Sequence, residues 1–247
     1  MSNRSKIIRL SVLALICLLT ITPMQSSAAL VWTEYFDELD ADIWTYQSCQ
    51  IIDGQLRGTH ADHASAVILY RESTVAVGTW KFELNETGEW GEELDICRFW
   101  ILSPLQPEVP DWEYYALSIV HAGGAAGQRL SYTIEKYVDN NPKVILDSYL
   151  GEAMETTVGT FHQFMITRDA GGQITVYLNS TLIMQATDTA LDSTGWFGFY
   201  TWDDWALDNI EVYDTIETGL NLPLVLSIGA GGVIIVAAIL IYQYKRR

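Results

Sequence analysis

The stretch Thr194-Gly-Trp-Phe-Gly-Phe-Tyr-Thr-Trp-Asp-Asp-Trp-Ala-Leu-Asp-Asn-Ile-Glu-Val-Tyr-Asp214 decides the fold class of this chain. Its first part, Trp196 to Thr201, is dense in aromatic residues, and its second part, Ala206 to Tyr213, carries several aliphatic ones. Aromatic and β-branched residues favour strands. We therefore expect two strands joined by an acidic, Trp-rich bend, a pair that closes a β-sandwich.

The chain before this stretch has the same character. Between Arg129 and Val138, apolar residues alternate with Ser131, Thr133 and Glu135. Segments of this kind, separated by turn signals such as Asp53-Gly54, predict antiparallel strands. About thirteen such segments exceed an immunoglobulin domain and favour an all-β, antiparallel jelly-roll sandwich.

The first 29 residues are typical of a targeting segment. Basic residues lie near the start, an uncharged apolar run extends from Leu10 to Ile21, and small residues follow. This order predicts a signal peptide at residues 1–29, cleaved after about Ala28 or Ala29. An uncleaved anchor is the alternative.

The other end contains an uncharged run from Leu222 to Tyr242, followed by basic residues. About 20 apolar residues in a helix cross a bilayer, and basic flanks stay cytoplasmic. We expect an extracellular domain at 30–214, a short tether at 215–221, a transmembrane helix at 222–242 and a basic cytoplasmic tail at 243–247. The predicted protein is a single-pass component of the cell membrane with its N-terminal domain outside.

The charge of the predicted domain is strongly negative. Between the two end segments lie all 31 acidic residues but only eight of the 14 basic ones. Such a surface repels nucleic acid, so we expect no nucleic-acid partner.

Because the domain is predicted to be exported, two kinds of covalent modification are expected, a disulfide and N-glycosylation. Cys49 and Cys97 remain after cleavage and are candidates for one disulfide, although the sequence leaves open whether they meet. Asn85 and Asn179 begin acceptor sequons and are candidate glycosylation sites.

Short motifs at both ends of the domain resemble a known family. Tyr35 to Asp37, Trp44 and residues 51–56 resemble the opening of concanavalin A-like lectin and glucanase sandwiches, which include laminin G-like members. Residues 195–199 and 206–212 resemble their closing strands. The resemblance implies a domain that binds glycans or proteins on a concave face or rim loops, and some members are glycosidases.

One segment resembles a catalytic strand. Family 16 glycoside hydrolases carry Glu-x-Asp-x-Glu there, so Glu93 matches the nucleophile and Asp95 the assisting carboxylate. The acid/base position falls on Cys97, or on Arg98 in the bulged form, and neither side chain performs that role. The resemblance thus implies an incomplete catalytic site.

Tryptophans in apparent loops are our candidates for ligand contact, because flat rings stack on sugar faces and nearby carboxylates accept hydroxyl hydrogen bonds. The candidate ligand-binding residues are Trp90, Trp112, Trp202, Asp203, Asp204 and Trp205. The alternatives are that these rings cover sandwich edges or contact lipid headgroups. The strand tryptophans Trp44, Trp80 and Trp100 are expected in the core.

The resemblance also suggests a structural Ca²⁺. Related sandwiches often hold one with a ligand on the closing strand, where Asp208 falls. Glu34 and Asp37 would approach Asp208 if the terminal strands pair. No other cofactor is expected.

Together these features favour a membrane-anchored, lectin-like surface module that binds carbohydrate, with a glycan or a surface protein as its partner. A family 16 type hydrolase with a degenerate Glu93/Asp95 site is one alternative, and a protein-binding or structural envelope component is the other.

Overall fold

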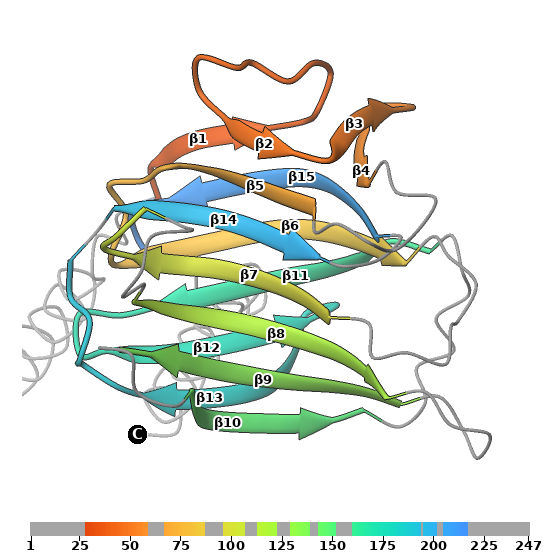
Figure 1. Cartoon of the computed structure of the whole chain (residues 1–247). Coiled ribbons are helices and arrows are strands. Elements are labelled where there is room, and N and C mark those ends of the chain that lie inside the picture. Colours follow the sequence, from red (N-terminus) through yellow and green to blue (C-terminus); the bar gives the residue numbers. More distant parts are fainter. Residues whose placement is uncertain are drawn as a thin grey trace, which may run out of the picture.

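The computed structural model describes residues 28–58, 67–86, 96–106, 113–122, 129–138, 143–151, 160–193, 195–201 and 205–216. These residues form two antiparallel sheets, which confirms the predicted all-β sandwich. The front sheet of Figure 1 contains β2 (Thr45–Gln47), β5 (Val67–Glu72), β7 (Ile96–Ser103), β8 (Tyr114–Ala122), β9 (Arg129–Tyr137), β10 (Val144–Leu150) and β14 (Trp196–Thr201). The back sheet contains β1 (Leu30–Glu34), β3 (Cys49–Ile52), β4 (Gln55–Gly58), β6 (Gly78–Glu86), β11 (His162–Arg168), β12 (Gln173–Leu178), β13 (Thr181–Thr187) and β15 (Trp205–Tyr213).

The stretch that decided the fold class forms β14 and β15, but these strands are not partners. β14 lies between β7 and β5 in the front sheet, whereas β15 lies in the back sheet between β6 and the strands β4 and β1 (Figure 1). The prediction that the two strands pair to close the sandwich is therefore wrong. Each one is instead a central strand of its own sheet, so the stretch contributes to both layers.

The core between the sheets is built around stacked aromatic rings. Phe82 of the back sheet stacks on Phe99 of the front sheet, with ring centroids 3.7 Å apart. Phe164 and Phe199 extend this contact within each sheet. Trp44 and Trp80 are buried in the same core, as predicted, and the alternation of β9 places Leu130, Tyr132 and Ile134 there. Burying such large apolar side chains is the main favourable term in folding.

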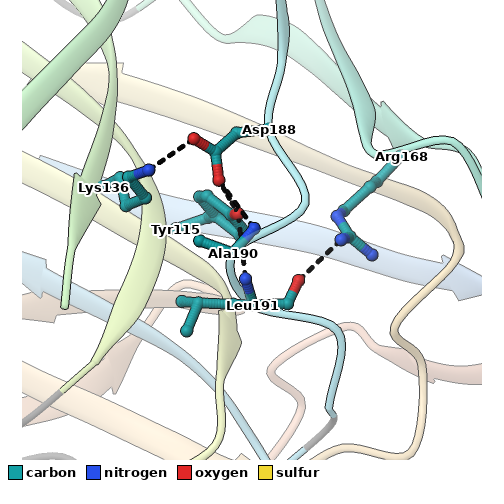
Figure 2. A network of polar contacts seen from close by, with 6 residues as sticks. All are labelled: Tyr115, Lys136, Arg168, Asp188, Ala190 and Leu191. Atoms are coloured by element: carbon teal, nitrogen blue, oxygen red, sulfur yellow. Dashed lines mark hydrogen bonds and ion pairs between the residues drawn. The ribbon is translucent and has the colours of Figure 1, made fainter.

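A network of polar contacts stabilises the segment that crosses from β13 to β14 (Figure 2). The Asp188 carboxylate accepts hydrogen bonds from the Tyr115 hydroxyl, the Lys136 ammonium and the Ala190 N–H. The Leu191 N–H donates to the Tyr115 oxygen at 3.1 Å, and Arg168 donates to the Leu191 carbonyl at 2.6 Å. Burial, with the Asp188 hydrogen bond, raises the pKa of Tyr115 to about 12. The crossing segment is thus tied to both sheets.

The described residues contain no helix long and apolar enough to cross a bilayer. The predicted transmembrane helix at 222–242 and nearly all of the predicted signal peptide lie outside the part of the chain that the structure describes.

Candidate functional site

Most of the predicted ligand contacts fall outside the described residues. This applies to Trp90, Trp112, Trp202, Asp203 and Asp204, and to the catalytic candidates Glu93 and Asp95. Trp205 is described, and its assignment to the ligand surface is wrong because its side chain is only 4% exposed and belongs to the core. As the first residue of β15, it faces the same side as Leu207, which is fully buried.

The residues proposed for a calcium site, Glu34, Asp37 and Asp208, lie near the junction of the terminal strands. β1 does pair with β15, opposing Glu34 and Ile210. Both Glu34 oxygens, however, already accept hydrogen bonds, from the Phe36 N–H at 2.9 Å and the Trp44 indole at 2.7 Å. Burial raises the pKa of Asp208, and the charges of Glu83 and Asp37 raise it further. Within the described ranges no three acidic, His or Cys side chains converge on a metal position, and a structural Ca²⁺ at these residues remains a prediction.

The candidate disulfide and the two candidate glycosylation sites differ in how the structure places them. Cys49 begins β3 of the back sheet and Cys97 lies on β7 of the front sheet, and no disulfide joins them. Asn85 is only 5% exposed near the end of β6, so the folded chain does not present it for glycosylation. Asn179 is exposed in the turn between β12 and β13, where its glycosylation remains a prediction.

The outer face of the front sheet carries a second packed cluster, which we call the aromatic patch. Trp100, Tyr114 and Ala116 are buried there, with Ile68, Tyr137 and Tyr200 partly exposed around them. These residues come from β5, β14, β7, β8 and β9, which are successive neighbours in the sheet (Figure 1). The patch therefore extends across five strands.

Trp100 organises this patch. It is buried as predicted, with 1% of its surface exposed, but in this second cluster rather than between the two sheets. Its ring lies 6.0 Å from that of Tyr200 and 6.5 Å from that of Tyr114, which in turn stacks on Tyr137 at 5.6 Å. Gly198 opposes Trp100 on β14, and a Cβ at Gly198 would lie 2.5 Å from Cε3 of Trp100. The glycine thus leaves the space in which the indole lies across the neighbouring strand.

Beside the aromatic patch, the same face carries a polar group centred on Glu135. Its Oε1 atom accepts hydrogen bonds from the Thr133 hydroxyl at 3.0 Å and from Lys143 Nζ at 2.7 Å. Arg98 Nε donates to the Ser118 hydroxyl at 2.9 Å and lies 3.5 Å from Glu135 Oε2. Direct pairing of Arg98 with Ser118, and of Ser118 with Thr133, brings these residues from three strands into one row.

The two oxygens of Glu135 differ in a way that matters for function. The side chain is 1% exposed, and Oε2 is a buried atom that receives no hydrogen bond. The 3.5 Å contact with Arg98 is an ion pair, but it is too long for a hydrogen bond of ordinary strength. A buried acceptor without a donor is rare in folded proteins, and each case calls for a specific explanation.

Electrostatics link the polar group to the aromatic patch. Burial raises the pKa of Tyr114, the positive charge of Arg98 opposes this rise, and the negative charge of Glu135 adds to it. Arg98 also lies 5.8 Å from the centre of the Tyr200 ring. The face therefore combines aromatic rings, an acceptor carboxylate and a guanidinium within one continuous surface.

This arrangement can hold a polyhydroxylated ligand, with hydroxyl groups on Glu135 and Arg98 and an apolar side against the aromatic rings. Hydrolysis by a retaining mechanism needs two carboxyls about 5 Å apart. The carboxyls predicted for that purpose, Glu93 and Asp95, lie outside the described residues.

Sequence reasoning placed Glu135 on the polar face of its strand, with Ser131 and Thr133, but gave it no role. The sequence did contain a signal. Glu135 lies in the middle of a regular strand, and an acidic residue that is buried in a folded protein almost always has a partner. The residues that identify the site, Arg98 and Lys143, are separated from Glu135 in sequence by 37 and eight positions, and only the strand pairing brings them together.

The fold is that of the concanavalin A-like lectins and glucanases. Similar solved structures include the Emp47p carbohydrate recognition domain (TM-score 0.58, 12% identity, covering 78% of this chain and 100% of that one). The exoplasmic/lumenal domain of VIP36, bound to Ca²⁺ and Man3GlcNAc, has a TM-score of 0.58 at 11% identity, covering 77% of this chain and 92% of that one. The κ-carrageenase from Pseudoalteromonas carrageenovora, in complex with an oligotetrasaccharide of κ-carrageenan, has a TM-score of 0.56 at 9% identity. The match covers 78% of this chain and 97% of that one. No protein-family model and no curated protein sequence matches the chain.

Proposed function

We propose that the outer face of the front sheet binds carbohydrate. The observation that carries the proposal is the buried Glu135 carboxylate, whose Oε2 atom receives no hydrogen bond although Oε1 receives two. Leaving such an acceptor unsatisfied costs about 1–3 kcal/mol. Because Oε2 is buried, a sugar hydroxyl reaches it only when the side chain of Arg98 or of Lys143, which are 19% and 41% exposed, moves aside. The new hydrogen bond then removes this cost, which favours the bound state.

The surroundings of Glu135 support a sugar over other hydroxyl-bearing ligands. The partly exposed rings of Tyr137 and Tyr200 offer flat apolar surfaces to the C–H face of a pyranose. Arg98 uses Nε for Ser118 and is 19% exposed, so the donors on its terminal nitrogens are left for ligand oxygens. Three proteins of the same fold are described as recognising or holding glycans, which supports the same ligand class here.

A glycan array followed by calorimetry with the best ligand tests this proposal. Glu135→Gln keeps one acceptor oxygen for Thr133 and Lys143 but replaces Oε2 with an amide NH₂, so we expect affinity to fall about 10- to 100-fold. Glu38→Gln, at an exposed position between β1 and β2, is the matched control and should leave binding unchanged. Equal affinity of wild type and Glu135→Gln for every bound glycan would refute the proposed site.

We also infer that this domain acts outside the cell and is attached to the membrane. The apolar segments before residue 30 and at 222–242, together with the basic residues at 245–247, support this placement. Protease treatment of intact cells should remove the domain and leave a short membrane-bound fragment, whereas a fully protected domain would contradict the inference.

A further inference from the structure

The outer face of the back sheet contains a hollow that the proposed function does not use. Its volume is about 340 Å³, within the range of about 300–1,000 Å³ typical of small-molecule sites. The residues that line the hollow include Glu83, Gln163, Met165, Tyr177 and Asn209. They belong to β6, β11, β12 and β15, so the hollow lies on the side of the sandwich opposite the aromatic patch.

A β-bulge in β15 shapes this hollow. Asp208 opposes Glu83 and Glu211 opposes Lys81, so β15 contains one more residue than β6 over this span. Asn209 takes up the extra length with a positive φ of 50°, a conformation that Asn tolerates better than most residues. A bulge redirects side chains, and here Leu207 and Ile210 both face the core while Asp208 and Asn209 both face outward.

One wall of the hollow is polar, and both oxygens of its Glu83 carboxylate already accept hydrogen bonds. The Gln163 amide donates to one Glu83 oxygen at 3.0 Å, and the Asn209 amide donates to the other at 2.8 Å. Both amide groups are thus held in place by their NH₂ ends. Their carbonyl oxygens remain as acceptors for a ligand.

The opposite wall is apolar. Met165 and Tyr177 are direct cross-strand partners on β11 and β12, and both are partly exposed. A thioether and a phenol ring side by side form a flat surface for C–H groups. Lys81 lies next to Met165 in the sheet and opposes Glu211, so one positive charge and two carboxylates border the hollow.

From these contacts we propose that the hollow is a second binding site, for a neutral sugar, on the face opposite Glu135. An anion would approach the carboxylates of Glu83 and Glu211, a cation would approach Lys81, and a wholly apolar ligand would desolvate all three charges. A neutral pyranose pairs its hydroxyls with the amide oxygens of Gln163 and Asn209 and its C–H face with Tyr177. Two sites on opposite faces make the domain bivalent, so that it can bridge two glycans.

Methyl NMR on the full chain, labelled at the methionine methyl groups, tests the second site directly. Met165 lines the hollow, whereas Met184 is 2% exposed in the core and serves as the internal control. Glucose, galactose, mannose, N-acetylglucosamine and cellobiose are titrated to millimolar concentrations. We expect at least one of them to shift the Met165 methyl signal in a saturable way and to leave Met184 in place. No such shift with any of these sugars would overturn the proposal.

Four variants separate this site from the one on the front sheet. Tyr177→Ala should weaken the Met165 response about tenfold, while Tyr177→Phe keeps the ring and should preserve it. Asn209→Gly retains the positive φ, removes the amide and should weaken the response without opening the bulge. Glu135→Gln should leave the Met165 response unchanged. A response lost in Glu135→Gln, or retained in both Tyr177→Ala and Asn209→Gly, would contradict a second site.

Discussion

Glu135 and Lys136 are neighbours on β9 and point to opposite faces of the front sheet, so each belongs to a different polar group. Lys136 points inward to Asp188, whose two oxygens accept three hydrogen bonds in the network of Figure 2. Glu135 points outward, is buried more completely, and has one oxygen without a hydrogen bond.

The difference between these carboxylates separates structural from binding roles. Burial alone raises the pKa of Asp188, but the hydrogen bonds from Lys136, Tyr115 and the Ala190 N–H together outweigh it and lower the pKa below its ordinary value. Asp188 therefore stabilises the folded chain, with hydrogen bonds from the protein on both of its oxygens. Glu135 has one oxygen without such a bond, at a cost to stability that ligand binding would relieve.

The largest expected effect on the free energy of unfolding comes from removing the Asp188 carboxylate. Asp188→Ala leaves Tyr115, Lys136 and the Ala190 N–H without their acceptor, and we expect a loss of about 3 kcal/mol in the free energy of unfolding. Urea denaturation measures it. Asp192→Ala, an exposed residue of the same segment, is the control and should change little. Equal losses in the two variants would show that the network does not hold the crossing segment.

Removing the Glu135 carboxylate should change the stability little and abolish glycan binding. Glu135→Leu eliminates a buried charge, and its partners Arg98 and Lys143 are 19% and 41% exposed, so they can regain water. We expect the free energy of unfolding to change by no more than about 1 kcal/mol, and glycan binding on the front sheet to be lost. A loss of stability as large as that of Asp188→Ala would make Glu135 a structural residue.

The smallest effect concerns acid stability. Because folding lowers the pKa of Asp188, its contribution is fully present above the ordinary unfolded value, about 3.9, and is lost as the pH falls through the folded value. The stability difference between wild type and Asp188→Asn should therefore shrink as the pH drops below about 4. Denaturation curves at several pH values measure this, and a constant difference would mean that another group dominates.

The sequence predicted the layers better than the site. Alternation between Arg129 and Val138 correctly separated the core-facing residues of β9 from the outward-facing ones, because the two-residue period of a strand is local. Trp205 was predicted to contact a ligand but lies in the core, whereas Trp100 is buried as predicted but on the outer side of the front sheet. Either face of a strand accepts a large ring once something covers it, so composition does not tell a core tryptophan from one packed on the outside.

By itself, the sequence determined that this chain forms an antiparallel sandwich, since strand propensity, alternation and turn residues are properties of short segments. The concanavalin A-like kind was implied by the resemblance of motifs at both ends of the domain. Only the tertiary structure decided that β14 and β15 enter different sheets, that Arg98 and Lys143 meet Glu135, and that a bulge at Asn209 opens a hollow behind them. Those outcomes depend on hydrogen bonds between strands far apart in the chain, and such pairing leaves no mark in any single segment.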